Sequence, residues 1–414
     1  GAGRLAFHIL KKLCEIRDYA GIPLPPFRYV MSDLPVKNIS SWQQHPGLQP
    51  FAEQGLLDFA RGEKVFHGQF AQVNNEDIVQ ALLDRYTYWE DELDKISFYA
   101  SHYSARDWSN AKLQASLDDE TWEIPAALKR GDTQHLGTVY KRFAHDDHTR
   151  YTSLRMRVSD HTGETLAENE TQLLVLPKEY RSAAYALPIA VVNVAAQSDV
   201  AAPEMSATPP ITATAAEPQQ TSPSPLEQPK GTPTLVRDMS ALGYTVLPQI
   251  TSDTHLLVTS APDQQILAWV RAGGDMLLIS PLNNPFFWQH GRGGAYGGSW
   301  ITTWSWLRPG IYKRLGRAGN PLGLPFAQIM PHTTLFGLPV QDKKYHADFL
   351  AGQVGGWVRH PTIHTVQFRY GRGRVVLTTF RLGRMGITQP ISGAMFHDLV
   401  DYITSDDCQP TLSI

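Results

Sequence analysis

The strongest constraint on the fold is an alternation of apolar and polar side chains that recurs along the middle of the chain. It follows the aromatic and acidic run at residues 85–92, covers residues 95–103, and returns at residues 154–158 and 171–175. A period of two residues is typical of a strand with one buried and one solvated face. We therefore predict a small, all-β sandwich over residues 92–196.

Two shorter patterns support the sandwich. Between residues 111 and 117, Ala and Leu alternate with Lys, Gln and Ser, which predicts another half-buried strand. The run from Asp160 to Gly163 has the composition of a tight turn between two strands. Strands at this spacing with such turns are typical of an antiparallel β-sandwich.

Composition narrows the classes of function. Hydrophobic residues make up 42% of the 414 residues and charged residues 19%, which predicts a mostly globular chain. The net charge of −3 gives no reason to expect nucleic acid or an anionic membrane as a partner. No apolar run reaches the eighteen or so residues of a membrane span. The two cysteines, Cys14 and Cys408, form no metal-ligand cluster, so we expect no metal and no cofactor.

The region before the sandwich resembles the end of an α/β barrel. Residues 5–16 carry apolar side chains at helical spacing, and residues 27–31 form a short apolar run before a polar pair. Helix, turn and strand in this order are the unit of such barrels, so we predict a barrel-terminal segment over residues 1–91. A further helix is predicted at residues 76–84. The chain opens at Gly1 without a Met and enters a helical pattern at once, so we expect a fragment or a trimmed sequence.

The composition changes sharply after the sandwich. Residues 197–233 are dominated by Ala, Pro, Thr, Ser and Gln, which predicts a disordered linker. From residue 234 to residue 406 we predict an α/β domain, with a tail at residues 407–414.

Within this domain, a helix at residues 265–272 lies between apolar strands at 256–258 and 276–279, which predicts a βαβ unit. Helices are also predicted at residues 235–242 and 395–403. A hairpin is predicted around Gly371 and Gly373.

Candidate binding residues occur first in the barrel-like segment. Asp33, Trp42 and His45 follow the predicted strand, on what would be the active-site rim of a barrel. The Asp would hold a sugar hydroxyl and the Trp would stack on a sugar ring. The alternative, which we favour, is that Asp33 caps a loop and Trp42 packs against the sandwich. The acidic residues Glu90 to Glu92 are predicted to be a solvated charge run.

A second group of candidates is aromatic. Trp288, Trp300 and Trp304 flank a stretch that contains five glycines between residues 291 and 298. These side chains would form a platform or lid that binds a sugar, or they would pack and fix the orientation of the domains. The two interpretations have equal weight for the group. For Trp306 we favour packing.

No pair of catalytic carboxylates is predicted. A retaining glycosidase needs two carboxyl groups about 5 Å apart. The pair Asn169-Glu170 lies inside the sandwich, where we expect a solvated edge, and Asn75-Glu76 suits a helix start. The α/β domain contains no Cys between residues 235 and 382 and no Gly-x-Ser-x-Gly motif, so it is predicted not to be an independent enzyme.

Three stretches resemble glycoside hydrolase family 2. Residues 45–49 with 55–59 resemble the barrel end, residues 90–103 with 167–170 resemble the distal sandwich, and residues 273–278 resemble an amidotransferase-like (flavodoxin-like) accessory domain. The resemblance implies the C-terminal portion of a glycoside hydrolase acting on β-linked sugars, with this chain supplying accessory and rim elements.

Two other functions stay open. One is a non-catalytic carbohydrate-binding or scaffolding protein, and the other is a hydrolase that uses Asp33 as an acid. The expected partner is an oligosaccharide or glycoside. Whether the chain forms a homo-oligomer is left open. The compartment is left open between cytoplasm and export.

Overall fold

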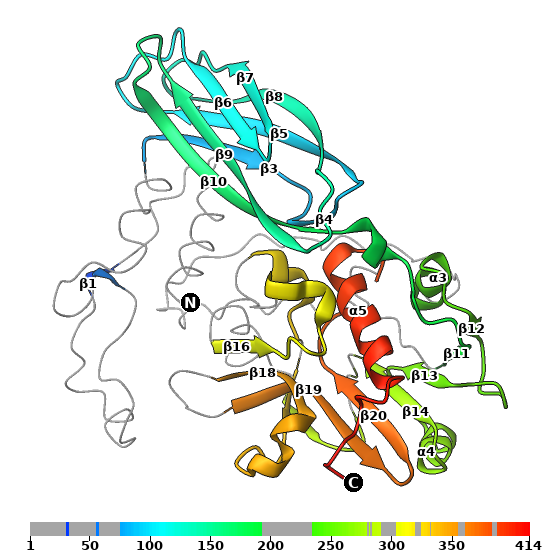
Figure 1. Ribbon diagram of the computed structural model, residues 1–414. Coiled ribbons are helices and arrows are strands. Elements are labelled where there is room, and N and C mark those ends of the chain that lie inside the picture. The colour runs from blue at the N-terminus through cyan, green and yellow to red at the C-terminus, as the bar shows by residue number, and fades with distance from the viewer. Residues whose placement is uncertain are drawn as a thin grey trace, which may run out of the picture.

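The computed structural model describes most of the chain from residue 75 onward. The described residues are 30–32, 55–57, 75–192, 234–279, 281, 284–290, 304–318, 324–331, 333–354, 361–382 and 387–414. This part is mostly β-sheet with few helices, so the coarse prediction of a mixed, β-rich chain is confirmed. Figure 1 shows two units: strands β3 to β10 above, and a second sheet with helices α3, α4 and α5 below.

The upper unit is a sandwich of two sheets. Its strands are β3 (Asp77–Leu82), β4 (Thr87–Trp89), β5 (Leu93–His102), β6 (Lys112–Leu117), β7 (Glu120–Pro125), β8 (Asp132–Arg142), β9 (Arg150–Ser159) and β10 (Thr165–Leu176). One sheet has the order β3-β5-β8 and the other β4-β10-β9-β6-β7. A buried apolar cluster with Phe98, Leu113 and Met156 fills the space between the sheets.

The predicted alternation corresponds to real strands. In β6, Leu113, Ala115 and Leu117 are buried while their neighbours are more exposed. The predicted turn joins β9 to β10, with Gly163 at φ +89°.

The helix predicted at residues 76–84 is wrong, because β3 pairs with β5 there and is buried on both faces. A strand buried on both faces has no alternation, so its apolar residues also fit a helical period.

The lower unit is a sheet with helices on both faces. Its strands are β11 (Ile189–Val191), β12 (Val246–Leu247), β13 (Leu256–Thr259), β14 (Asp275–Ile279), β15 (Trp288–His290), β16 (Trp304–Leu307), β17 (Thr334–Phe336), β18 (Phe349–Val354), β19 (Pro361–Tyr370) and β20 (Gly373–Thr378). Its helices are α3 (Thr234–Ala241), α4 (Gln264–Arg271) and α5 (Pro390–Ile403), and its 3-10 turns are η3 (Lys313–Ala318), η4 (Leu324–Ile329) and η5 (Lys343–Asp348).

The strands at one side of this sheet are parallel. β11 pairs in parallel with β12 and β13, and β14 pairs in parallel with β13 and β20. Helices α3 and α5 cover one face and α4 covers the other. Asp263 caps α4 by accepting a hydrogen bond from the backbone of Ile266. The predicted βαβ unit, the β19–β20 hairpin and the three helices are confirmed, although α5 already begins at Pro390.

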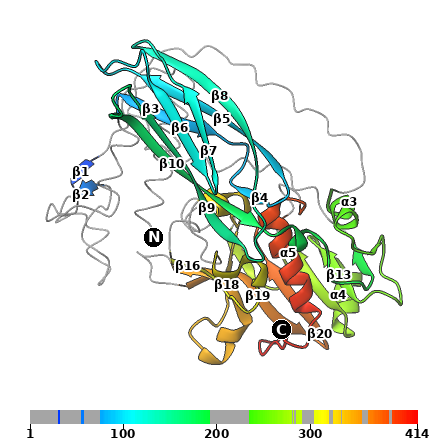
Figure 2. The same ribbon diagram turned by 45° about the horizontal axis from the view of Figure 1, so that its top comes forward.

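The two units share one apolar core. Trp89, Leu174 and Leu176 of the sandwich belong to the same buried cluster as Met395 of α5. Both views show β4, β9 and β10 reaching the end of α5 (Figures 1 and 2). The sandwich strands therefore run from Asp77 to Leu176 rather than over residues 92–196, and β11 belongs to the lower sheet.

Polar contacts also cross this junction. The Nε2–H of His397 donates a hydrogen bond to the carbonyl of Arg181, at 3.1 Å, in the 3-10 turn η2 (Lys178–Arg181) that leaves the sandwich. The hydroxyl of Tyr244 donates to Nδ1 of the same imidazole, at 2.6 Å. Burial lowers the pKa of His397 to about 4, so this ring is neutral and can accept that bond.

Little is described before residue 75. The short strand β1 (Val30–Ser32) pairs in parallel with β2 (Gly55–Leu57). The predicted helix at residues 5–16 and the predicted linker at residues 197–233 lie outside the described residues. None of the helices in the described ranges is long and apolar enough to cross a membrane.

Candidate functional site

The outer face of the five-stranded sheet has two different halves. Toward β4 its side chains are apolar, and Tyr151, Leu174 and Leu176 pack into the core shared with the lower unit. Further along β9 and β10 the same face carries charged and amide side chains, which are exposed. Strand alternation places both sets on one side, because residues two apart share a face. The lower unit therefore covers the apolar half and leaves the polar half open.

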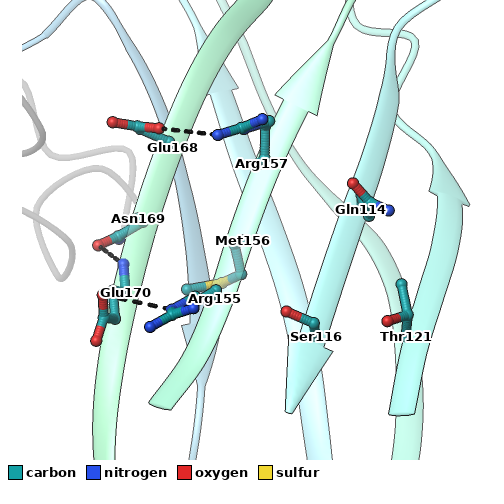
Figure 3. Close-up of a pocket in the computed structure, with 9 residues that line it drawn as sticks. All are labelled: Gln114, Ser116, Thr121, Arg155, Met156, Arg157, Glu168, Asn169 and Glu170. Atoms are coloured by element: carbon teal, nitrogen blue, oxygen red, sulfur yellow. Dashed lines mark hydrogen bonds and ion pairs between the residues drawn. The ribbon is translucent and has the colours of Figure 1, made fainter. Parts of the chain in front are cut away.

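Strand register arranges the polar half in two rows across the sheet. In one row, Glu168 of β10 lies opposite Arg157 of β9, which lies opposite Gln114 of β6. In the other row, Glu170 is opposite Arg155 and Arg155 is opposite Ser116, which in turn pairs with Thr121 of β7. These side chains line a shallow hollow of about 350 Å³ (Figure 3).

The two ion pairs between arginine and glutamate in these rows are long. Arg157 and Glu168 approach to 3.9 Å, as do Arg155 and Glu170. All four side chains are at least half exposed, with Arg155 at 73%. Exposed ion pairs of this length stabilise a fold by little, typically below about 1 kcal/mol. The donors of Arg157 and the acceptors of Glu168 are therefore able to turn toward a ligand at small cost.

The floor of the hollow is rigid. Asn169 is buried, and its side-chain amide donates a hydrogen bond of 2.7 Å to the carbonyl of Val79 in the opposite sheet. The backbone N–H of Glu170 donates to Asn169 Oδ1 at 2.8 Å. The solvated edge predicted for Asn169-Glu170 is confirmed for Glu170, whose side chain is 51% exposed, and is wrong for Asn169, which is buried. The two side chains point to opposite faces, so they do not act as one pair.

A second cavity lies at the junction of the two units. It has a volume of about 400 Å³ and is lined by Arg85, Trp89, Asp91, Glu92, Arg181, Ala241, Leu242, Thr388 and Gln389. Its charged groups bind one another closely. Arg181 contacts both carboxylate oxygens of Asp91, at 2.7 and 3.1 Å, and Arg85 contacts Glu92 at 2.7 Å. These pairs hold the junction together and leave its charges less available than those of the open face.

The solvated charge run predicted at Glu90 to Glu92 is wrong. Glu90 is 3% exposed and accepts hydrogen bonds from His145 and from the backbone of Asp146. Glu92 accepts from the backbone of Trp89 at 2.9 Å. The partners His145 and Asp146 lie in the β8–β9 loop, far from Glu90 in the sequence. The acidic composition of the segment therefore predicted exposure to solvent. The segment instead anchors the end of the sandwich.

A buried Asp, His and Ser come together at the start of β3. The Nδ1–H of His102 donates to Asp77 at 2.9 Å, and the hydroxyl of Ser104 donates to the same carboxylate at 2.6 Å. A catalytic serine would instead donate to the imidazole. All three residues are buried, so this cluster fixes a turn and does not form a nucleophile.

The predicted binding residues have different outcomes. Trp288 lies on β15, is 66% exposed, and contacts the ring of Phe336 at 5.1 Å between centroids. Trp304 belongs to β16, which pairs with β18 and lies away from the polar face, and its side chain is outside the described residues. Asp33, Trp42, His45 and Trp300 also lie outside them. Of the predicted binding residues, Trp288 has a described side chain, and it lies on the lower sheet and not among the residues that line the hollow.

Comparisons with known proteins add no family. No family model matches the chain, and no curated protein matches it. Among solved structures, the CARDB domain of a Pyrococcus furiosus protein has 9% identity and a TM-score of 0.19, over 24% of this chain and 89% of its own. A Niemann-Pick type C2 protein from the Japanese carpenter ant has 10% identity and a TM-score of 0.17, over 25% and 90%.

A Bacteroides uniformis beta-glucuronidase has 10% identity and a TM-score of 0.16, and the match covers 34% of this chain and 15% of the enzyme. These likenesses are too small to support a functional argument.

Proposed function

We propose that this chain is a non-catalytic, carbohydrate-binding accessory portion of a protein resembling glycoside hydrolase family 2. Its contact surface is the polar half of the outer sheet face, formed by Gln114, Ser116, Arg155, Arg157, Glu168 and Glu170. The lower unit is an accessory domain of the amidotransferase-like type, and its role is to hold the sandwich in place.

The observation that carries this proposal is the pair of exposed rows over the hollow. Each row alternates an acceptor carboxylate, a donor guanidinium and a neutral polar group across neighbouring strands. A sugar presents hydroxyls that donate and accept, so it needs both kinds of partner in close succession. The opposite charges balance, which favours an uncharged ligand over an anion or a cation. The strands hold the rows on a rigid floor.

Hydrolysis has weaker support. A retaining glycosidase needs a proton donor and a nucleophile about 5 Å apart on opposite sides of the bond to be cleaved. Glu168 and Glu170 lie two apart on one strand, and each pairs with an arginine. Asp33, the acid of the alternative mechanism, lies outside the described residues. A carbohydrate-binding role fits these side chains better than a catalytic role.

A glycan array tests the proposal without assuming the sugar. The whole chain should retain uncharged oligosaccharides, and Arg157→Gln should reduce the signal at least tenfold. Arg142→Gln is the matched control, because Arg142 is also exposed but lies on the other sheet. The same preparations should not hydrolyse nitrophenyl glycosides. If no glycan is retained, or if turnover is found and survives purification, the proposed function is wrong.

A further inference from the structure

Three potential metal ligands meet beside the junction of the two units. Glu90 follows β4, His145 lies in the loop between β8 and β9, and Glu179 lies in η2. One ligand atom from each lies within 4.8 Å of the other two. Each residue comes from a different segment, so the fold itself brings them together. The three residues lie far apart in the sequence, so no local ligand motif predicts this cluster.

Glu90 distinguishes this cluster from an ordinary group of solvated acids. Its side chain is 3% exposed, and among the described residues its ion-pair partner is the half-exposed imidazole of His145. Burying an ionised carboxylate is costly unless a charge compensates it. The backbone N–H groups of Asp146 and Lys178 donate to Glu90, the first to Oε2 at 3.0 Å, and Oε1 faces Nδ1 of His145 at 2.7 Å. Carboxylates that bind metals are commonly oriented by such an outer hydrogen bond.

We propose that Glu90, His145 and Glu179 bind a divalent transition-metal ion of the zinc class. An imidazole with two carboxylates is a donor set that suits zinc, whereas calcium takes oxygen ligands alone. Zinc lies about 2.0–2.2 Å from such donors. The hydrogen bond between His145 and Glu90 would open as the ion replaces the proton between them.

Neighbouring groups complete the surroundings of the ion. Asp147 Oδ1 lies 3.4 Å from Nε2 of His145, the ring nitrogen that faces away from Glu90, so this carboxylate would orient the imidazole and not bind the ion. Lys178 Nζ lies 3.9 Å from Glu179 and is the cation that the metal would displace. His145 and Glu179 are 58% and 53% exposed, so the ion can enter from solvent and keep bound water.

The ion would link three segments that touch the lower unit. In η2, next to Glu179, Tyr180 lies beside Arg314 and the carbonyl of Arg181 accepts from His397. At the end of the β8–β9 loop, the hydroxyl of Thr149 donates to the carbonyl of Arg314. Metal binding would therefore stiffen the contact between the two units, independently of any sugar.

Calorimetric titration of the metal-free full chain with zinc chloride tests this site. The wild type should bind one zinc ion that His145→Gln and Glu179→Gln each weaken at least tenfold, and zinc should raise its Tm. Glu179→Gln leaves the contact between His145 and Glu90 in place and so spares the fold. His145→Gln removes the ion-pair partner of the buried Glu90, so the Tm of this variant without zinc is measured first and only a folded variant is compared. Glu90→Gln is not used, because Glu90 is buried. His148→Gln is the matched control, because His148 lies in the same loop at 87% exposure and outside the cluster.

The outcomes separate cleanly. Zinc that binds elsewhere in the chain would also bind to His145→Gln, so its binding heat can be subtracted from that of the wild type. The proposal is overturned if the wild type takes up no zinc, if His145→Gln binds it as tightly as the wild type, or if His148→Gln loses it to the same extent. Cobalt in place of zinc should give a visible absorption band that also disappears in His145→Gln.

Discussion

Single residues of the sandwich show which burial can be predicted from the alternation of apolar and polar side chains and which cannot. Alternation correctly predicts which side chains of β6 are buried, because burial there follows strand parity. It fails for Asn169, Asp77 and Glu90, which are polar and buried. Each is compensated by a partner distant in sequence, such as Val79 for Asn169. Such contacts exist only once the fold has formed, so no local pattern contains them.

Asp77 gives a prediction at this scale. Burial alone would raise the pKa of its carboxyl, but hydrogen bonds from Ser104, His102 and the backbone of Tyr103 outweigh that effect and hold the pKa below the usual 3.8. We expect Asp77→Asn to lower the free energy of unfolding by about 3 kcal/mol, the range for breaking a buried charged contact. Urea denaturation of both proteins measures the difference.

The pH dependence checks the same explanation. A lowered pKa means that the folded state favours the carboxylate, so its contribution is present above the ordinary Asp pKa and is lost as pH falls through the lowered value. The gap between wild type and Asp77→Asn should therefore shrink on acidification below about pH 4. A gap that stays constant would show that the carboxylate charge does not matter. Asp253→Asn, an exposed substitution, controls for general acid effects.

At the scale of elements, the tryptophans of the lower unit have two different roles. Trp306 on β16 packs against the apolar cluster that also contains residues of α4, and its ring would meet a Cβ placed on Gly352 of β18 at 2.7 Å. Trp288 is 66% exposed on β15. From the sequence, both belong to one aromatic stretch with glycines. Their different environments depend on which strands β15 and β16 pair with, which composition does not specify.

We expect the two tryptophans to respond differently to truncation. Trp306→Ala should lower the free energy of unfolding by about 3 kcal/mol, the low end for emptying a buried Trp site, since this ring is partly exposed. Trp288→Ala, which serves as its control, should change it by less than about 0.5 kcal/mol. Chemical denaturation followed by circular dichroism measures both. Equal losses of unfolding free energy would contradict this assignment, because they would mean that Trp288 contributes to packing as much as Trp306 does.

At the scale of the whole molecule, one sheet face serves two purposes. Its apolar half, with Leu174 and Leu176, joins the lower unit, and its polar half stays open above the hollow. The predicted β-rich architecture, the βαβ unit and the hairpin followed from periodicity and turn residues. The position of the hollow did not, because it depends on strand register across β6, β9 and β10.

The central claim is that the open half of this face binds an uncharged oligosaccharide. The most direct test is calorimetric titration of the full chain with the best glycan from the array, compared with Arg155→Gln/Arg157→Gln. We predict that the double variant keeps its Tm and loses at least tenfold in affinity, about 1.4 kcal/mol, while Arg142→Gln binds like the wild type. Unchanged affinity in the double variant, with the fold intact, would contradict the account.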